Sequence, residues 1–400
     1  MSKQIQDAYI VAATRLPVGR RKGMLGHVRP DDMLAHAIRS VMEQAPGLDP
    51  ALVEDVIVGC AMPEAEQGMN VARIGLLLAG MPNTVPGVTV NRFCASGVQT
   101  VAMAADRIRL GEADVLIAGG TETMSLMNQM TGNKTALNPL IFEKEENYAI
   151  GFGMGITAEK VAAQWQVSRE DQDAFAVASH QKACAAIDAG HFRAEITPYA
   201  VRTRVPDLQS GEVRVKEYLA ENDEGPRRDS SIEGLARLRP VFAARGSVTA
   251  GNSSQMSDGA AAVLLVSEKV LKQFNLQPLA RFAGFAVAGV APEIMGIGPL
   301  EAIPRVLRQA GIGQHEVDWF ELNEAFAAQA LAVIRTLDLD PAKVNPLGGA
   351  IALGHPLGAT GAIRTATLLH GLQRTRQRYG MVTMCIGTGM GAAGLFESMQ

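Results

Sequence analysis

Cysteine is scarce in this 400-residue chain, which contains only Cys60, Cys94, Cys184 and Cys385. No two of them form a CxxC pair, so the sequence excludes a disulfide framework and has no zinc-site spacing; no bound metal is expected. We therefore expect reduced thiols and a cytoplasmic location. Long hydrophobic runs are also missing. The apolar run at residues 9–13 is too short to span a membrane, and we expect it to form the first buried strand.

The sequence also lacks an excess of positive charge. It has 37 Lys and Arg against 41 Asp and Glu, a net charge of -4, which excludes a broad basic surface, so no nucleic-acid partner is expected. Hydrophobic residues make up 47% and charged residues 20%, values typical of a well-buried globular protein. The length predicts two or three domains rather than a small binding module.

Two distant parts of the sequence follow the same order of elements. A helical pattern at 34–42 leads to an apolar strand at 53–60, and a helix at 302–310 leads in the same way to a strand at 317–323. Two further pairs of similar segments follow in the same order, 89–97 with 344–354 and 113–120 with 381–387. Apolar runs that end in glycine and alternate with Ala-rich helices predict strands buried on both faces. We therefore predict an α/β protein with two homologous halves.

A long stretch without repeats separates these halves. We expect the first half to comprise residues 1–123 and a returning strand within 251–277, and the second half to comprise 278–400. Residues 124–250, with a helix predicted at 168–189, are expected to form an inserted loop domain. Insertions of this kind beside a paired α/β core usually cover a ligand.

Four polar side chains are predicted to follow strand ends: Cys94, Asn323, His355 and Cys385. Cys94 precedes a helix whose free N–H groups would stabilise a thiolate, and the glycine-proline turn at His355 would aim an imidazole that can act as a base. Each residue alone is also explained by packing or by a turn. Because strand ends gather at one edge of a doubly wound sheet, the four together favour acyl transfer through a thioester. Metal binding fits less well, since no carboxylate or second histidine has ligand spacing.

Four sequence blocks then resemble the signature motifs of the thiolases, at residues 91–97, 323–327, 348–358 and 385–391. The similarity runs from Tyr9 to Glu397. Ketoacyl synthases share the fold and the nucleophile but pair it with two histidines or with His and Asn, so they match less well. The resemblance implies the thiolase fold, in which two βαβαβαββ halves form a layered αβαβα arrangement with an inserted loop domain.

The resemblance also implies roles for individual residues. Cys94 would attack the 3-keto carbon of a 3-ketoacyl-CoA, with His355 as the general base. Cys385 would protonate the departing acetyl-CoA carbanion. One oxyanion site would use His355 and a water held by Asn323, and the other the backbone N–H groups of Cys94 and Gly387.

Coenzyme A and acyl-CoA are expected as substrates, with no permanently bound cofactor. By resemblance, four residues would lie along the pantetheine arm: Met154, Ser254, Ala325 and Phe326. Arg227 or Arg228 would contact the nucleotide phosphates. The two arginines are equally explained as an ordinary solvated charge pair, and Ser254 as a turn residue that caps its own backbone.

Departures from the family pattern bear on the substrate. Gly153 stands where many short-chain biosynthetic members have His, which favours a degradative 3-ketoacyl-CoA thiolase of fatty acid β-oxidation. Ile363 stands where Arg commonly follows Gly-Ala, with Arg364 next to it. The alternatives are an acetyl-CoA acetyltransferase, a 3-oxoadipyl-CoA thiolase and, from another class, an inactive CoA-binding scaffold subunit. We expect a homodimer through the first half, or a homotetramer; some degradative thiolases are subunits of a multifunctional β-oxidation complex.

Overall fold

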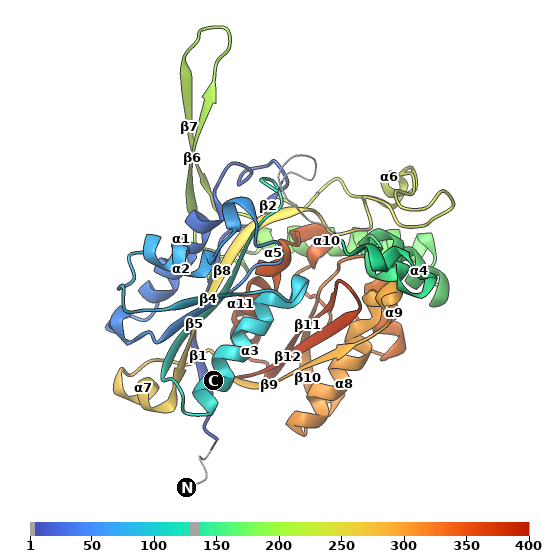
Figure 1. The fold of residues 1–400 in the computed structure, drawn as a ribbon. Coiled ribbons are helices and arrows are strands. Elements are labelled where there is room, and N and C mark those ends of the chain that lie inside the picture. Colours follow the sequence, from blue (N-terminus) through green and yellow to red (C-terminus); the bar gives the residue numbers. More distant parts are fainter. Residues whose placement is uncertain (1–4, 128–136, 400) are drawn as a thin grey trace.

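The computed structural model describes residues 5–127 and 137–399, which form a long mixed β-sheet with helices on both faces (Figure 1). The strands lie in the order β10-β11-β12-β9-β1-β8-β5-β3-β4, and the short β2 pairs with β8. Their bounds are β1 Ala8–Arg15, β2 Gly19–Arg20, β3 Asp55–Gly59, β4 Gly87–Val90, β5 Val115–Thr123, β8 Ser257–Ser267, β9 Ala280–Gly289, β10 Val317–Leu322, β11 Tyr379–Ile386 and β12 Met390–Ser398. The predicted buried first strand is confirmed as β1.

The sheet consists of two similar parts that meet at β1 and β9. Among the described residues, the two strands are paired at two positions, Tyr9 with Arg281 and Ile10 with Ala280. In each part a parallel pair is followed by antiparallel strands: β3 pairs with β5 and β5 with β8, while β10 pairs with β11 and β11 with β12. The predicted internal repeat is therefore confirmed. It is imperfect, because the predicted strand at Val344 is reduced to a single bridge with Phe320.

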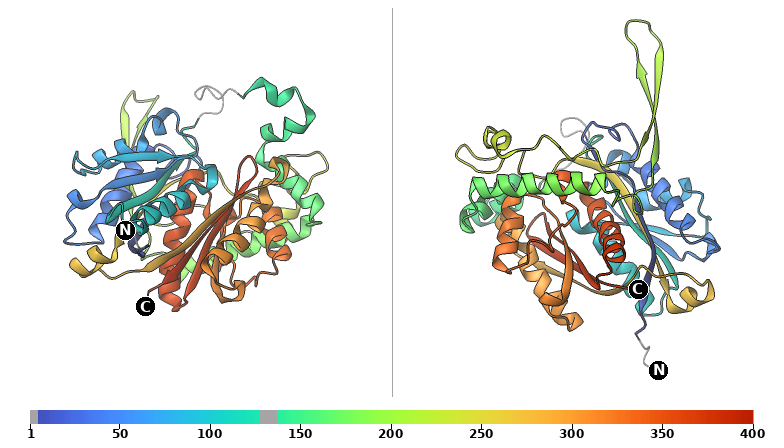
Figure 2. Two further views of the ribbon diagram at one scale, coloured as in Figure 1. Left: turned by 60° about the horizontal axis from the view of Figure 1, so that its bottom comes forward. Right: turned by 180° about the vertical axis from the view of Figure 1, so that it is seen from behind.

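The helices complete a layered arrangement. Their bounds are α1 Pro30–Glu43, α2 Val71–Leu78, α3 Ser96–Arg109, α4 Met154–Gln164, α5 Arg169–Asp188, α6 Ile232–Ala236, α7 Glu268–Gln273, α8 Gly298–Ala310, α9 Ala327–Thr336, α10 Ala350–Leu353 and α11 Leu357–Thr375. Helices α3 and α11 pack against each other between the two parts of the sheet (Figures 1 and 2). On the outer faces, α1 packs on β8 and α8 packs on β9 and β12. The αβαβα order implied by the resemblance is thus confirmed.

Helix α1 illustrates why the sequence folds in this way. Its apolar residues recur at helical spacing, and Leu34, Ile38 and Val41 are fully buried against the sheet. Pro30 fits the first turn, where a backbone N–H has no helical partner, and Asp31 and Asp32 lie near the positive end of the helix dipole. Burial of each of these three aliphatic side chains contributes roughly 1.5–3 kcal/mol to the stability of the fold.

The segment between the two parts contains α4, α5, α6 and a long hairpin. Strands β6 (Tyr199–Pro206) and β7 (Val213–Ala220) project away from the body of the molecule (Figure 1). The predicted helix at 168–189 is confirmed as α5, whose N-terminus is capped by Ser168 accepting from the Asp171 N–H. Strand β8 returns to pair with β5 and β1, as expected. The division at residues 123, 250 and 277 stays a prediction, and residues 128–136 of the predicted insertion lie outside the described part.

No helix within residues 5–127 and 137–399 combines the length and apolarity needed to cross a bilayer. The same residues contain no cluster of three or more His, Cys, Asp or Glu side chains arranged to hold a metal ion. The four cysteines are free thiols.

Candidate active site

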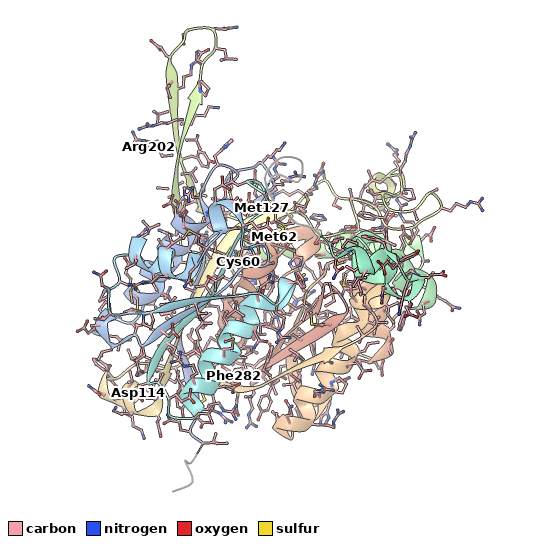
Figure 3. The ribbon with its side chains drawn as sticks, viewed as in Figure 1. Cys60, Met62, Asp114, Met127, Arg202 and Phe282 are labelled. Carbon is pink, nitrogen blue, oxygen red and sulfur yellow. The ribbon has the colours of Figure 1, made fainter. Side chains whose placement is uncertain are left out.

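The four predicted polar residues come from elements that pack together. Cys94 lies in a single 3-10 turn, η3 (Phe93–Ala95), which leads into α3 and packs against α11 and β11. His355 lies two residues before the start of α11, Cys385 is near the end of β11, and Asn323 follows β10. Cys60 and Met62, which follow β3, lie toward the hairpin side of the molecule, whereas Asp114 and Phe282 lie toward the opposite end (Figure 3). The strand ends therefore bring the predicted residues to one edge of the sheet.

Cys94 is half-buried at the sharp turn before α3. Phe93 has a φ of +46°, a strained value for a non-glycine residue, and its N–H donates to Oδ1 of Asn91 (2.8 Å). Burial raises the pKa of the Cys94 thiol to about 11, the N–H of Gly387 opposes this by donating to the thiol, and the Glu122 carboxylate adds to the rise. Burial therefore outweighs the amide donors that were expected to stabilise a thiolate, and a nucleophile at Cys94 is a neutral thiol that needs a base, as the expected role of His355 implies.

His355 is buried and held at both ring nitrogens. Nδ2 of Asn323 lies 3.3 Å from Nε2, and Oγ1 of Thr360 lies 2.6 Å from Nδ1. Since an amide nitrogen is only a donor, Nε2 accepts, and Nδ1 carries the proton and donates to Thr360. Burial lowers the pKa of His355 to about 3, and the nearby Arg364 cation lowers it further. The imidazole is consequently neutral, with its basic nitrogen toward Asn323.

Asn323 and Cys385 complete this group. The side-chain Oδ1 of Asn323 is buried and has no hydrogen-bond partner in the part of the chain that is described, which fits a bound water. Cys385 is fully buried in an apolar cluster with Phe326 and Ala325. Burial, followed by the neighbouring Cys94, raises the pKa of its thiol.

The four residues predicted along a pantetheine arm lie next to these thiols. Sδ of Met154 is 3.6 Å from the position that a Cβ on Gly387 would occupy. Ala325 and Phe326 share the cluster that contains Cys385, and the Ser254 N–H donates to the Ala325 carbonyl (2.9 Å). The structure therefore brings all four to the same region.

Arg227 and Arg228, the two arginines expected at the nucleotide phosphates, differ in their surroundings. Arg228 is exposed and pairs with Asp188, with Nη1 2.8 Å from Oδ2, as the solvated-pair interpretation predicts. The backbone N–H of Arg227 donates to Nδ1 of His180 (3.1 Å). Arg227 and His180 line a cavity of about 390 Å³, with Ser231 and Leu235 of the α6 region also in its wall. Arg227 therefore faces a space that could hold a ligand, whereas Arg228 is held by Asp188.

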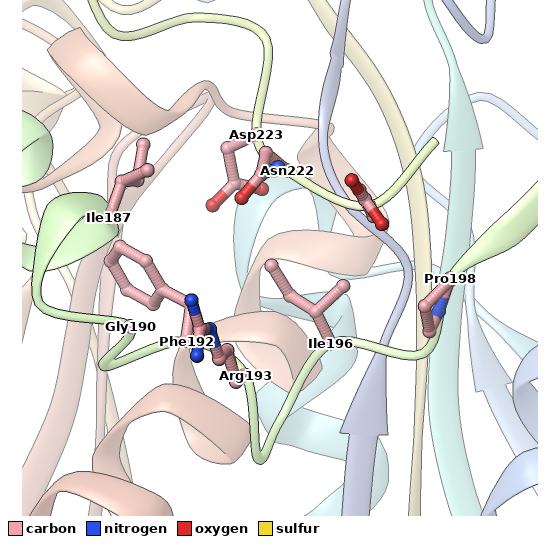
Figure 4. A pocket seen from close by; sticks show the side chains of 9 residues that line it. Ile187, Gly190, Phe192, Arg193, Ile196, Pro198, Asn222 and Asp223 are labelled. Carbon is pink, nitrogen blue, oxygen red and sulfur yellow. The ribbon is translucent and has the colours of Figure 1, made fainter. Parts of the chain in front are cut away.

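A second cavity, of about 370 Å³, lies near the base of the hairpin (Figure 4). Its described wall includes Phe192, Arg193, Ile196, Asn222 and Asp223, and none of the predicted site residues. Asp223 is already paired there with the buried Arg15, whose Nη1 lies 2.7 Å from Oδ1.

Two residues close to the site were missed from the sequence. Thr360, which accepts from Nδ1 of His355, gave no signal, because a threonine inside a helix is unremarkable. Glu122 lies just beyond the strand predicted at 113–120; the structure extends this strand to Thr123, so Glu122 becomes a charged residue within nine consecutive buried positions. A buried charge of this kind needs several partners.

The chain matches two family models, "Thiolase, N-terminal domain" at residues 8–269 and "Thiolase, C-terminal domain" at residues 276–398. A 3-ketoacyl-CoA thiolase of Bacillus subtilis is 50% identical over 98% of this chain and 100% of its own length. A beta-ketoadipyl-CoA thiolase of Pseudomonas aeruginosa is 44% identical over 97% and 98%. The crystal structure of the Bacillus anthracis acetyl-CoA acetyltransferase superimposes with a TM-score of 0.89 at 38% identity, covering 100% of both chains. The chain therefore belongs to the thiolase family of acyltransferases.

Proposed function

We propose that this chain is a degradative 3-ketoacyl-CoA thiolase, which uses coenzyme A to cleave a 3-ketoacyl-CoA into acetyl-CoA and an acyl-CoA shortened by two carbons. The observation that carries the proposal is that Cys385 lies beside Cys94, while Asn323 links the neutral imidazole to the same strand. Asn323 contacts His355, and its backbone N–H donates to the Thr383 carbonyl of β11 (2.9 Å), the strand that carries Cys385. Two thiols beside one base suit a reaction with one nucleophile and one proton donor.

The first half-reaction begins at Cys94. As its sulfur bonds to the 3-keto carbon, the thiol proton passes to Nε2 of His355. The tetrahedral intermediate collapses, the bond between C2 and C3 breaks, and the electron pair moves into the acetyl-CoA enolate. Cys385 then gives its proton to C2, which releases acetyl-CoA and leaves an acyl group on Cys94.

The second half-reaction restores the enzyme. The thiol of free coenzyme A attacks the Cys94 thioester, and its sulfur replaces that of the enzyme. The proton of the coenzyme A thiol and the proton held by His355 pass to the two thiolates, which restores the thiols of Cys94 and Cys385. The negative oxygen of each tetrahedral state would be stabilised by the backbone N–H groups of Cys94 and Gly387, while a water on Asn323 and His355 would stabilise the enolate oxygen.

Coenzyme A would bind beside these residues. The pantetheine arm would run past Met154, Ser254, Ala325 and Phe326, as their position next to Cys385 supports. The cavity of about 390 Å³ that Arg227 lines offers room for part of the nucleotide. No permanent cofactor is proposed.

The degradative subtype rests on the space next to Met154. A Cβ on Gly153 would have no described atom within 4 Å, so the position occupied by His in many biosynthetic members is open here. An open position leaves room for a longer acyl chain. A relative called acetyl-CoA acetyltransferase and one called beta-ketoadipyl-CoA thiolase keep those two activities as the competing assignments.

The test is steady-state thiolysis of 3-ketoacyl-CoA substrates from C4 to C16 and of 3-oxoadipyl-CoA, with Cys94→Ala as control. Highest kcat/KM on medium or long chains supports the proposal. A sharp preference for acetoacetyl-CoA assigns the chain to the acetyltransferases, and a preference for 3-oxoadipyl-CoA to that thiolase class. Absence of activity on every substrate favours the scaffold alternative, and full activity in Cys94→Ala overturns the nucleophile.

We also propose a homodimer formed through the first half, in the cytoplasm. Strand β4 is the edge of the sheet, and Val88 on it and the neighbouring Phe93 are exposed. Unpaired strand edges with apolar side chains readily pair with a second chain. Size-exclusion chromatography with light scattering should show a dimer or a tetramer; a monomer contradicts the proposal.

A further inference from the structure

Glu122, close to the end of β5, is fully buried and lies at the centre of a hydrogen-bond network. Its carboxylate accepts from the backbone N–H groups of Ala61 (2.7 Å), Met62 (3.3 Å) and Gly358 (2.8 Å), and from Nε2 of Gln67. The thiol of Cys60 adds a weak donor at 3.7 Å. A buried carboxylate is costly without partners, and these donors satisfy it, so the network holds the segments that supply them in a fixed arrangement.

The donors come from both parts of the molecule. The loop at 60–67 follows β3 of the first part, whereas Gly358 belongs to the first turn of α11, three residues after His355. A Cβ on Gly358 would lie 2.8 Å from Oε2 of Glu122 and 2.6 Å from the backbone nitrogen of Ala61. The close approach therefore depends on glycine at this position. A carboxylate at a helix N-terminus is also stabilised by the helix dipole.

This network lies beside the crossing of the two central helices. A Cβ on Gly97, in the first turn of α3, would be 3.0 Å from the carbonyl oxygen of Gly358. Cys94 lies two residues before the start of α3, and His355 lies two residues before the start of α11. Glu122 thus bonds to the start of one of these helices at the point where it touches the other, and it is also the charged group that acts on Cys94.

We propose that Glu122 is a positioning residue, which fixes the segment carrying His355 against the part of the molecule carrying Cys94 by tying Gly358 to the loop at 60–67. The proposal rests on the proposed function for its catalytic consequence. A shift of about 1 Å between nucleophile and base costs up to about 10²-fold in rate. The charge of Glu122 has a second effect, since it adds to the rise in the pKa of the Cys94 thiol.

The experiment compares Glu122→Gln, Glu122→Asp and Glu195→Gln with the wild-type chain. Glu122→Gln removes the charge and places an NH2 group against N–H donors. Glu122→Asp keeps the charge but is one methylene too short to reach both segments. Glu195 is a matched control, because it is fully buried and bonds to α11 at Thr367 (2.8 Å), far from its N-terminus; without it, Arg15 still pairs with Asp223.

Three quantities are measured on each purified protein: kcat and KM for thiolysis, the pH profile of Cys94 alkylation by iodoacetamide, followed on the Cys94 peptide, and the melting temperature. We expect both Glu122 variants to lose about 10²-fold in kcat with little change in KM. In Glu122→Gln the alkylation profile moves to lower pH, whereas in Glu122→Asp it stays in place. Glu195→Gln should keep kcat within about twofold even where its melting temperature falls.

Wild-type kcat in both Glu122 variants overturns the positioning role. So does a loss of kcat in Glu195→Gln equal to theirs at a similar melting temperature, since that shows a general effect of stability. If Glu122→Gln does not fold, Glu122→Asp decides the positioning role alone. If the wild-type chain cleaves no 3-ketoacyl-CoA, the proposed function fails. The role of Glu122 is then still tested by the Cys94 alkylation rate of the folded Glu122 variants at fixed pH. A rate equal to that of the wild type in both variants overturns this role.

Discussion

Nε2 of His355 accepts from Asn323 Nδ2 at 3.3 Å while Nδ1 of the same ring lies 2.6 Å from Thr360 Oγ1. The first contact decides the second: because the Asn323 amide nitrogen can only donate, the lone pair of the imidazole is on Nε2, and Nδ1 donates its proton to the Thr360 hydroxyl. The residue that accepts this proton therefore lies on α11 itself, five residues after His355.

Replacing Thr360 by Val should lower thiolysis without removing it. The change keeps the shape of the side chain but leaves the Nδ1 proton without an acceptor, so the ring loses its orientation. We expect kcat to fall about 10- to 100-fold, part of the 10²–10⁴ that a general base supplies. Steady-state kinetics measures this. Thr365→Val, in the same helix, is the control; an equal loss of kcat there would contradict the assignment.

A buried neutral histidine should make the protein sensitive to acid. Burial, helped by the Arg227 cation, lowers the pKa of His180 from 6.5 to about 4. Between these values the unfolded chain binds a proton that the folded chain refuses, so stability is lost as the pH falls from about 6.5 toward 4, by up to about 3 kcal/mol. In His180→Gln, whose amide oxygen can still accept from Arg227, the loss of unfolding free energy between pH 7 and pH 5 should be smaller.

Urea denaturation at both pH values measures this difference. The control is His27→Gln, at an exposed position. An acid sensitivity in His180→Gln equal to that of the wild type would show that other groups carry it.

The sequence predicts the architecture well because the fold depends on local patterns that repeat. Apolar runs that end in glycine became β5 and β11, and the strand ends gathered Cys94, Asn323, His355 and Cys385 at one edge, as parallel sheets require. The hairpin of β6 and β7 was not predicted. Its strands alternate β-branched and charged residues at 201–205 and 213–216, but β7 is exposed almost throughout, so the continuous buried apolar run that predicted the other strands is missing.

The electrostatics of the site could not be predicted, because they depend on contacts between distant residues. The pKa of Cys94 is set by burial more than by the helix N-terminus visible in the sequence. Arg228 finds its partner Asp188 forty residues away, and Glu122 finds Gly358 in the other part of the molecule. The departure from the family pattern at Ile363 and Arg364 could likewise be interpreted only from the structure, in which Arg364 pairs with the buried Glu321.

The crossing of α3 and α11 should not tolerate a methyl group. A Cβ on Gly361 would lie 2.1 Å from the backbone nitrogen of Val98, which cannot move without displacing α3. Although Ala is favoured over Gly in a helix by about 1 kcal/mol, Gly361→Ala should cost at least about 2 kcal/mol of unfolding free energy. Gly289→Ala is the control, since a Cβ there has no atom of the described chain within 4 Å. Denaturant titration of both variants measures the unfolding free energies. Equal values would mean that α3 and α11 can move apart to admit the methyl group.

Arg364 forms a buried pair with Glu321, with Nη1 3.6 Å from Oε2, and Trp319 Nε1 donates to the other carboxylate oxygen (2.8 Å). Burial raises the pKa of Glu321 to about 7, and Arg364 opposes this rise. In Arg364→Met the carboxylate loses its cation, and we expect a loss of about 3–5 kcal/mol of unfolding free energy at pH 8.

The size of this loss should depend on pH in a defined direction. Without Arg364 the folded-state pKa of Glu321 rises further above its unfolded value, so the folded chain holds a proton that the unfolded chain releases, and stability falls as pH rises, by at most about 1.4 kcal/mol per unit. The loss in Arg364→Met should therefore be smaller at pH 6 than at pH 8. Adding Glu321→Gln removes the charge, keeps the acceptor for Trp319, and should recover most of the stability at pH 8. A single variant that is equally destabilised at both pH values, with no recovery in the double variant, would show that Arg364 stabilises the fold through packing of its side chain rather than through its charge.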